Sequence, residues 1–399
     1  MSEQVAQNGA GGVPSEATNG DAQGDRRSSQ PLSEKTSTPH SNRTGWDGKL
    51  RMEKKAVVVN GNAVDNSDQE AESEDELPGE TIEADEADLL NDEDPEAEEI
   101  DAQHSRIASI PSLRLERFPK LTRLGLRQNL IRSIELPESL ASTLTELELY
   151  DNLISHIRHL DPFTNLRSLD LSYNKIKHIK HVDHLKNLTH LYLVQNKISK
   201  IEGLEGLEKL EYLELGANRI RVIEGLETLK SLTQLWLGQN KITSLQGLST
   251  CKSLRTLSIQ ANRIEDLEGL EELPQLEELY ISDNLVKSLA PLQSNPNIQI
   301  LDVQDNPIGT LDGIERLTKL ENFWASGCKI EKFEEVERAL KDKASLSEVY
   351  FERNPIQRQN EVLYRNKVRL ALPQVTKIDA GECKQRVRSC NILNQCSVC

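Results

Sequence analysis

The sequence has few of the features that mark a secreted or membrane-spanning protein. The first 30 residues contain no apolar core of a secretory signal, and no apolar run approaches the roughly 20 residues needed to span a bilayer. Four of the six cysteines lie in the last 17 residues, which leaves Cys251 and Cys328 for the rest of the chain. We therefore expect an intracellular protein with reduced thiols.

Motifs of common catalytic sites are also missing. The chain has no glycine-rich dinucleotide or phosphate-binding loop, no HExxH helix and no GxSxG turn, and its eight histidines follow no metal-ligand spacing. Acidic side chains that could act as acid and base are spread over many repeats and imply no closed pocket. The sequence thus predicts a protein that is not an enzyme and that needs no cofactor or metal.

Positive charge is absent from one long stretch. Residues 61–101 contain 19 Asp or Glu and no Lys or Arg, so they account for the net charge of −17 and the rest of the chain is close to neutral. Residues 1–95 are rich in Gly, Ser, Asn and acidic residues, which predicts a disordered acidic N-terminal region. Such a polyanion disfavours nucleic acids and anionic membranes as partners.

Residues 381–399 form a cysteine-rich tail that we expect to be disordered. Cys396-Ser-Val-Cys399 has the form of a prenylation box and contains the tail's one CxxC spacing. A final Cys is atypical for prenylation, and one CxxC is a weak signal for zinc, so an unstructured tail is the favoured interpretation.

One pattern, close to LxxLxLxxN, recurs eleven times after residue 120. The last residues of the copies are separated by 23 residues once, by 22 residues eight times and by 26 residues once. They are Asn129, Asn152, Asn174, Asn196, Asn218, Asn240, Asn262, Asn284, Asn306, Cys328 and Asn354. This pattern and period are typical of leucine-rich repeats.

The repeat predicts an α/β fold: a curved leucine-rich-repeat solenoid of 22-residue coils, with a parallel sheet on its concave side. Alternation within LxL directs Leu inward and its neighbours outward, and we expect each Asn to bond backbone groups of neighbouring coils. Apolar residues then recur every three positions, which favours 3₁₀ or turn structure on the convex side. Helices are expected at 334–343 and 364–373. The repeat domain spans 96–380 and is capped at both ends.

Aromatic and acidic residues concentrate at the outward strand positions, which line the concave face. Large aromatics on a rigid surface are typical anchors of protein interfaces, so we predict a protein-binding surface there. The aromatics are Tyr150, Tyr192, Tyr212, Trp236, Tyr280, Trp324 and Tyr350. The acidic residues are Glu146, Glu148, Asp170, Glu214, Glu278, Asp302, Glu348 and Glu352. The predicted partner surface combines apolar pockets with Lys or Arg.

Several coils resemble those of the leucine-rich-repeat regulatory subunit of protein phosphatase 1, the regulatory subunit 7 family. The resemblance covers roughly residues 95–380. The segments that carry it are LRQNLI (126–131), ELYDN (148–152), LVQNKISKIE (193–202), LELGANRIRVIE (213–224), LGQNKIT (237–243), FW (323–324), VYFERNP (349–355) and YRNKVRLALP (364–373).

The resemblance implies a non-catalytic subunit that binds the phosphatase catalytic subunit through its concave face and controls its activity, maturation and mitotic function. It also implies a nuclear location with a cytoplasmic pool, a role in chromosome segregation, a monomer when free, and a further inhibitory subunit as a third partner. An acidic residue that the family pattern places two before Trp324 is Asn322 here. The family's positions match Asp170, Tyr192, Glu214, Trp236, Asp302, Trp324 and Tyr350.

Together with the strand pattern, this predicts a binding site of nine residues. They are Glu148, Asp170, Tyr192, Glu214, Trp236, Tyr280, Asp302, Trp324 and Tyr350. The alternative is a leucine-rich-repeat scaffold for another protein, of the tubulin-folding, axonemal or spliceosomal type.

Overall fold

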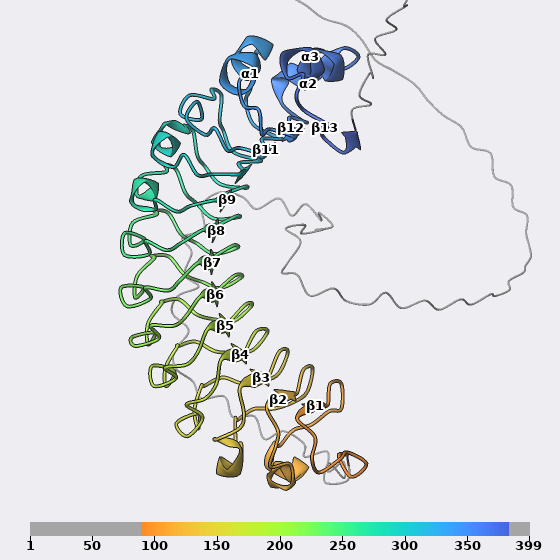
Figure 1. The fold of residues 1–399 in the computed structure, drawn as a ribbon, viewed down its shortest axis with the longest axis vertical. Helices are drawn as coiled ribbons and strands as arrows, with labels where there is room; N and C mark the ends of the chain where they lie inside the picture. Colours follow the sequence, from red (N-terminus) through yellow and green to blue (C-terminus); the bar gives the residue numbers. More distant parts are fainter. Residues whose placement is uncertain (1–88, 383–399) are drawn as a thin grey trace, which may run out of the picture. The chain divides into compact units, whose positions relative to one another are not determined.

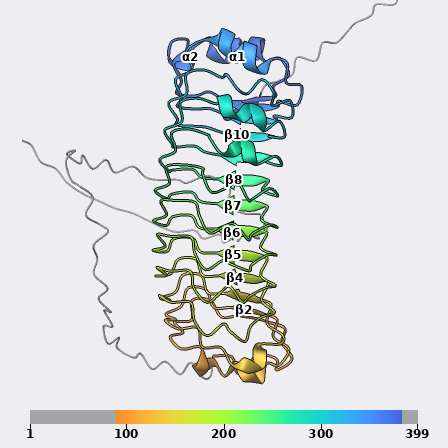
Figure 2. The ribbon, with the colours of Figure 1, turned by 90° about the vertical axis from the view of Figure 1, so that its left-hand side faces the viewer.

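The computed structural model describes residues 89–382, which form a curved stack of coils with strands on the concave side (Figure 1). Seen from the convex side, the coils lie as parallel layers (Figure 2). In this part of the chain the sheet has 14 strands in sequence order. They are β1 (Glu99–Asp101), β2 (Arg123–Gly125), β3 (Glu146–Glu148), β4 (Ser168–Asp170), β5 (His190–Tyr192), β6 (Tyr212–Glu214), β7 (Gln234–Trp236), β8 (Thr256–Ser258), β9 (Glu278–Tyr280), β10 (Ile300–Asp302), β11 (Asn322–Trp324), β12 (Glu348–Tyr350), β13 (Lys377–Ile378) and β14 (Gly381–Glu382).

Neighbouring strands pair in parallel from β1 to β13, and only β14 turns back to run antiparallel to β13. Most coils return through turns, with short helices on some of them. The 3₁₀ helices are η2 (Pro111–Leu113), η3 (Leu115–Arg117), η4 (Glu138–Leu140), η5 (Leu270–Glu272) and η6 (Ala290–Ser294). The α-helices are α1 (Phe333–Leu340), α2 (Pro355–Arg358) and α3 (Tyr364–Ala371). Among residues 89–382, none of these helices is long and apolar enough to cross a bilayer.

The predicted solenoid is confirmed, and its details differ in three places. Strands β1, β13 and β14 extend the eleven repeat strands at both ends. The helix expected at 334–343 ends at Leu340, and the one expected at 364–373 ends at Ala371. The short helix α2 follows Asn354 and carries no apolar period long enough to be detected. The predicted disordered regions lie almost entirely outside the described residues, so they stay predictions.

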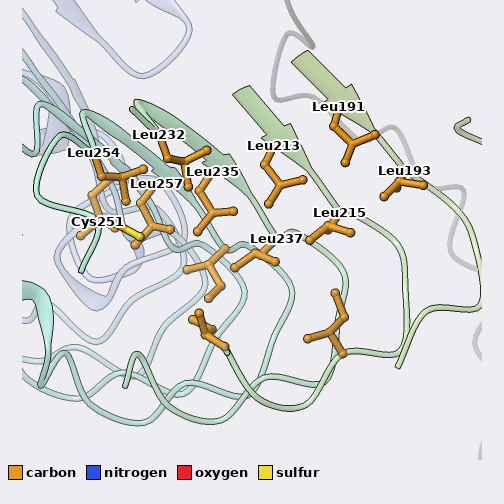
Figure 3. Packing of buried hydrophobic residues seen from close by; sticks show 14 of the residues in the cluster. Leu191, Leu193, Leu213, Leu215, Leu232, Leu235, Leu237, Cys251, Leu254 and Leu257 are labelled. Atoms are coloured by element: carbon orange, nitrogen blue, oxygen red, sulfur yellow. The ribbon is translucent and has the colours of Figure 1, made fainter. Parts of the chain in front are cut away.

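Inward leucines of successive coils stack to form one continuous core. In Figure 3, Leu213 and Leu215 of one coil lie between Leu191 and Leu193 of the preceding coil and Leu235 and Leu237 of the following coil. All of these side chains are fully buried. A single coil cannot bury its own apolar edge, so each coil depends on both neighbours.

Each buried asparagine joins its coil to the preceding one, as the sequence predicted. In the coil of β6, the Oδ1 atom of Asn218 accepts the backbone N–H of Ile198 at 3.0 Å. Its Nδ2 atom donates to the carbonyl of Leu193 at 2.8 Å and to that of Leu215 at 3.1 Å. One side chain thus satisfies backbone groups that the bend leaves without a partner in two coils.

Cys328 replaces the asparagine in one coil, and the neighbouring residues compensate. Its Sγ atom lies 3.3 Å from the carbonyl of Val303, and burial raises the pKa of the thiol to about 11, so it stays protonated. Gly327 has a φ of +70°, and a Cβ there would lie 2.2 Å from Asp305 Oδ1. This glycine leaves room for Arg353 to bond both carboxylate oxygens of Asp305, at 2.6 and 2.8 Å, across the intervening coil.

The ends of the solenoid are covered by polar and apolar contacts. Strand β1 pairs with β2, and Leu90 is buried against the first coil. At the other end, Asp379 takes the place of a repeat asparagine: its Oδ1 atom accepts the backbone N–H of Phe351 at 2.9 Å and the hydroxyl of Tyr364 at 3.2 Å. The last coil is therefore closed by α3 and the segment after it.

Lys343 shows why α1 ends before the predicted residue. Its side chain is buried, and its ammonium donates to the carbonyls of Ile314, Glu315 and Leu317 at 2.6, 3.2 and 3.0 Å. Desolvation lowers the pKa of this amine. The longer 26-residue coil uses the lysine to satisfy carbonyls of the preceding coil.

Replacing Asn218 by Ala leaves several buried backbone groups unpaired. We expect the free energy of unfolding to fall by about 2–4 kcal/mol. Urea unfolding measures this change. The matched control is Asn187→Ala, which removes two exposed bonds, to Thr164 and to Lys209, and is expected to cost less than about 1 kcal/mol. Equal losses in the two variants would contradict this role of the buried amide.

Lys343→Met is expected to lower the free energy of unfolding by about 2–3 kcal/mol, because three carbonyls lose their buried donor. Lys341→Met is the control, since Lys341 is exposed and its ion pair with Glu337 is long, at 4.0 Å. The midpoint of thermal unfolding should be clearly lower for Lys343→Met than for Lys341→Met. A Lys343→Met protein as stable as the parent would show that the carbonyls find other donors.

Candidate protein-interaction surface

The structure places all nine predicted site residues in one row across the concave sheet. Each is the third residue of its strand, and the strand register aligns them from Glu148 in β3 to Tyr350 in β12. Ser258 of β8 completes the row between Trp236 and Tyr280. We call these ten residues the third-position row. Their alignment follows from the parallel register, because each coil repeats the same alternation.

Aromatic rings form a continuous strip along this row. We define the aromatic strip as Tyr192, Tyr212, Trp236, Tyr280, Trp324 and Tyr350. Successive ring centroids in this order are 4.9, 6.3, 6.1, 6.3 and 6.1 Å apart. These separations are within the range of favourable ring contacts.

Two short side chains let the rings meet over intervening strands. Ser258 lies between Trp236 and Tyr280, and Asp302 lies between Tyr280 and Trp324. Both are buried. The rings on either side of Ser258 and of Asp302 therefore contact each other although their strands are not adjacent.

The two tryptophans are half-buried, whereas the sequence alone suggested a solvent-facing position. Their flanking rings cover part of each indole. Nε1 of Trp236 and of Trp324 is shielded from solvent, and within the described residues neither atom has a hydrogen-bond acceptor. The rings are thus held in place by packing, and they present rigid apolar area at little cost in side-chain entropy.

Carboxylates near the two ends of the sheet are neutralised within the protein. Glu148 pairs with Arg123 at 2.9 Å and also with Arg127. Glu348 pairs with Lys377 at 3.0 Å, and the same ammonium lies 5.5 Å from the ring centroid of Tyr350. Glu148, a predicted site residue, is therefore already occupied by two cations.

Three carboxylates in the interior of the row have no such partner: within residues 89–382, Asp170, Glu214 and Asp302 form no salt bridge. Asp170 accepts the N–H of Ser172 at 2.9 Å, Asp302 accepts that of Gln304 at 3.1 Å, and Glu214 accepts the Tyr212 hydroxyl at 2.9 Å. Burial raises the pKa of all three carboxyls in spite of these bonds.

Sequence reasoning left two neighbours out of the predicted site. Tyr212 and His190 occupy the first positions of β6 and β5, and their ring centroids are 5.8 Å apart. The sequence predicts Tyr212 to be a concave aromatic, but only the structure shows that its ring links Tyr192 to Trp236. His190 carried no signal beyond its outward position. Asn322, where the family pattern has an acidic residue, is half-buried in β11 beside the strip.

The arrangement fits recognition of a macromolecule. Within the described part of the chain, no group of three or more His, Cys, Asp or Glu side chains could hold a metal ion. The interior carboxylates lie on β4, β6 and β10, separated by at least one strand. What the face offers is a long aromatic strip with buried negative charge beside it.

Comparison with protein families identifies the repeats. Models described as leucine rich repeat match residues 142–198, 165–220 and 294–314, and a model of two leucine rich repeat copies matches residues 208–250 and 252–294. Among solved structures, an internalin of Listeria monocytogenes aligns with a TM-score of 0.56 at 21% identity, covering 75% of this chain and 89% of its own. The leucine-rich repeat domain of APL1B aligns with a TM-score of 0.53 at 21% identity, covering 71% of this chain and 81% of its own. At these identities the likeness shows the fold alone.

Curated relatives share shorter segments at higher identity. The protein phosphatase 1 regulatory subunit SDS22 of Schizosaccharomyces pombe is 52% identical over 85 residues, which is 21% of this chain and 24% of the relative. SDS22 of Saccharomyces cerevisiae is 42% identical over 86 residues, which is 21% of this chain and 25% of the relative. The matches therefore span about a quarter of these relatives. The chain contains leucine-rich repeats, and a segment of it is similar to the SDS22 regulatory subunits of protein phosphatase 1, as its sequence predicted.

Proposed function

We propose that this protein is a non-catalytic regulatory subunit that binds the catalytic subunit of protein phosphatase 1 through its concave face. The relatives named as phosphatase 1 regulatory subunits support the partner. The aromatic strip, with unpaired carboxylates beside it, supports the choice of surface. That combination is the observation that carries the proposal.

The surface has the composition of an interface core. Trp and Tyr are the residues in which binding energy concentrates, and rings that are already packed lose little freedom when a partner docks. Among the described residues, Asp170, Glu214 and Asp302 form no salt bridge, and burial destabilises their charged forms. A Lys or Arg of the partner placed beside them would reduce that penalty. The three carboxylates therefore favour a partner that has cations at the matching positions.

The proposal includes the wider roles that the resemblance implies. These are control of phosphatase activity, maturation and mitotic function, a nuclear location with a cytoplasmic pool, and a further inhibitory subunit in the complex. The free protein is proposed to be a monomer.

Replacing both tryptophans by alanine tests the surface directly. Trp236→Ala with Trp324→Ala is expected to weaken binding of the purified phosphatase catalytic subunit by at least about 100-fold, because each interface anchor contributes roughly 2 kcal/mol. Isothermal titration calorimetry measures the affinity, and circular dichroism with urea unfolding shows that the solenoid is intact.

Leu370→Ala is the control, since Leu370 is an 81% exposed apolar residue of α3 and lies outside the concave sheet. It should bind like the parent protein. A folded double variant that retains the parent affinity would exclude the concave aromatic strip as the binding surface.

Amide substitutions test the carboxylates separately. Asp170→Asn, Glu214→Gln and Asp302→Asn together are expected to weaken phosphatase binding by about ten-fold and to reduce its dependence on salt. The same triple variant should be at least as stable as the parent, because it no longer buries carboxylates that form no salt bridge with another described residue. Affinities at low and high salt, with unfolding midpoints, measure both effects.

The control for this set is Asp161→Asn, Glu208→Gln and Glu227→Gln, three exposed carboxylates outside the strands. It changes the net charge by the same amount and should leave binding nearly unchanged. If both triple variants weaken binding equally, net charge and not the concave carboxylates governs the association.

A further inference from the structure

A column of basic side chains follows the buried asparagines on five consecutive coils. It occupies the position directly after each asparagine, on the bend that leaves the concave sheet. We call these residues the basic column: Lys175, Lys197, Arg219, Lys241 and Arg263. The same position in the other coils is Leu130, Leu153, Leu285, Pro307, Lys329 or Pro355.

Backbone hydrogen bonds hold the basic column in register. The N–H of Lys197 donates to the carbonyl of Ile176 at 2.8 Å, and the N–H of Arg219 donates to that of Ile198 at the same distance. Equivalent bonds occur at the other three residues. The column therefore repeats at the coil spacing of about 4.8 Å.

Most of the column is exposed and carries uncompensated charge. Lys175, Lys197, Arg219 and Arg263 are exposed, and within residues 89–382 none of these four forms a salt bridge. Some basic residues elsewhere in the described part of the chain are paired, as with Arg338, which bonds Asp312, Glu315 and Glu335. Stacking like charges at this spacing is unfavourable, although long side chains can spread to reduce the repulsion.

The fold does not require charge at this position. Leu130 and Leu285 occupy it with 40% and 47% of their surface exposed, and the backbone bond at Leu285, to Ile264, has the same length of 2.8 Å. The asparagine bonds also have the same pattern in basic and apolar coils, as at Asn218 and Asn284. The basic residues thus contribute nothing to the coil that an apolar residue does not.

We propose that the basic column is a second docking surface, distinct from the concave face, which binds an acidic peptide segment of a partner protein. The column is only one residue wide on each coil, and acidic residues lie on both sides of it, which favours a narrow peptide as its partner. Glu202 and Glu224 lie farther along the same coils, and Asp170 and Glu214 lie on the concave side. A nucleic-acid duplex or an anionic membrane would bring its phosphates over these carboxylates, whereas one acidic segment can follow the column alone.

The spacing of the basic residues also matches the spacing of carboxylates on a helical peptide. Carboxylates three or four residues apart on a helix are about 5–6 Å apart, close to the spacing of the coils. A segment lying along the solenoid would therefore place successive carboxylates opposite successive coils. The proposal does not depend on the phosphatase function, because it concerns a separate surface.

Charge reversal in the column tests the proposal on the full-length protein. The probe is a fluorescein-labelled oligoglutamate peptide, whose binding is measured by fluorescence anisotropy at low and moderate salt. Lys197→Glu with Arg219→Glu is expected to weaken binding by at least about ten-fold, and affinity for the parent should fall as salt rises. Unfolding midpoints confirm that both proteins are folded.

The matched control is Lys209→Glu with Lys230→Glu, which makes the same change of charge at exposed positions on the opposite bend. It is expected to change binding by less than about two-fold. Equal weakening in the two variants, or no binding of the peptide to the parent, would overturn the proposal. Duplex DNA or anionic vesicles that displace the peptide more strongly than unlabelled oligoglutamate would overturn the assignment to a peptide.

Discussion

The fold depends on the hydrogen bonds that each buried asparagine makes between one coil and the preceding one. At Asn218 the side-chain amide bonds the backbone at Ile198, Leu193 and Leu215, so it satisfies both coils at a bend where strand pairing has stopped. An isolated coil has neither a closed core nor partners for these groups. Stacking supplies both at once, and it sets a constant spacing and register for everything on the surface.

That register also fixes the geometry of the concave face. Ring contacts from Tyr192 to Tyr350 require that side chains on successive strands point the same way at a fixed separation. Where Ser258 and Asp302 interrupt the row, the neighbouring rings still meet because the sheet between them is regular. The surface proposed to bind the partner is therefore ordered by contacts within the protein itself.

The same stacking separates charge around the coil. Carboxylates gather on the strands, and the basic column lies on the bend that follows, a few residues farther along each repeat. Carboxylates near the ends of the sheet form salt bridges, as Glu148 does with Arg123. Within the described residues, Asp170, Glu214 and Asp302 form none, and burial raises the pKa of all three. Some coils thus have an acidic strand position on the concave side and a basic position on the following bend. Stacking of the coils repeats both positions along the solenoid.

The sequence by itself determined the period, the inward leucines, the asparagine positions and the membership of the concave row, because these follow from alternation within one repeat. It did not determine the half-burial of Trp236 and Trp324 or the link through Tyr212, nor did it show that Lys343 would satisfy carbonyls of another coil. Those features depend on distances between coils and on which side chains are short enough to let others pass. Only the stacked structure decides them, since a local pattern fixes the direction of a side chain but not its neighbours.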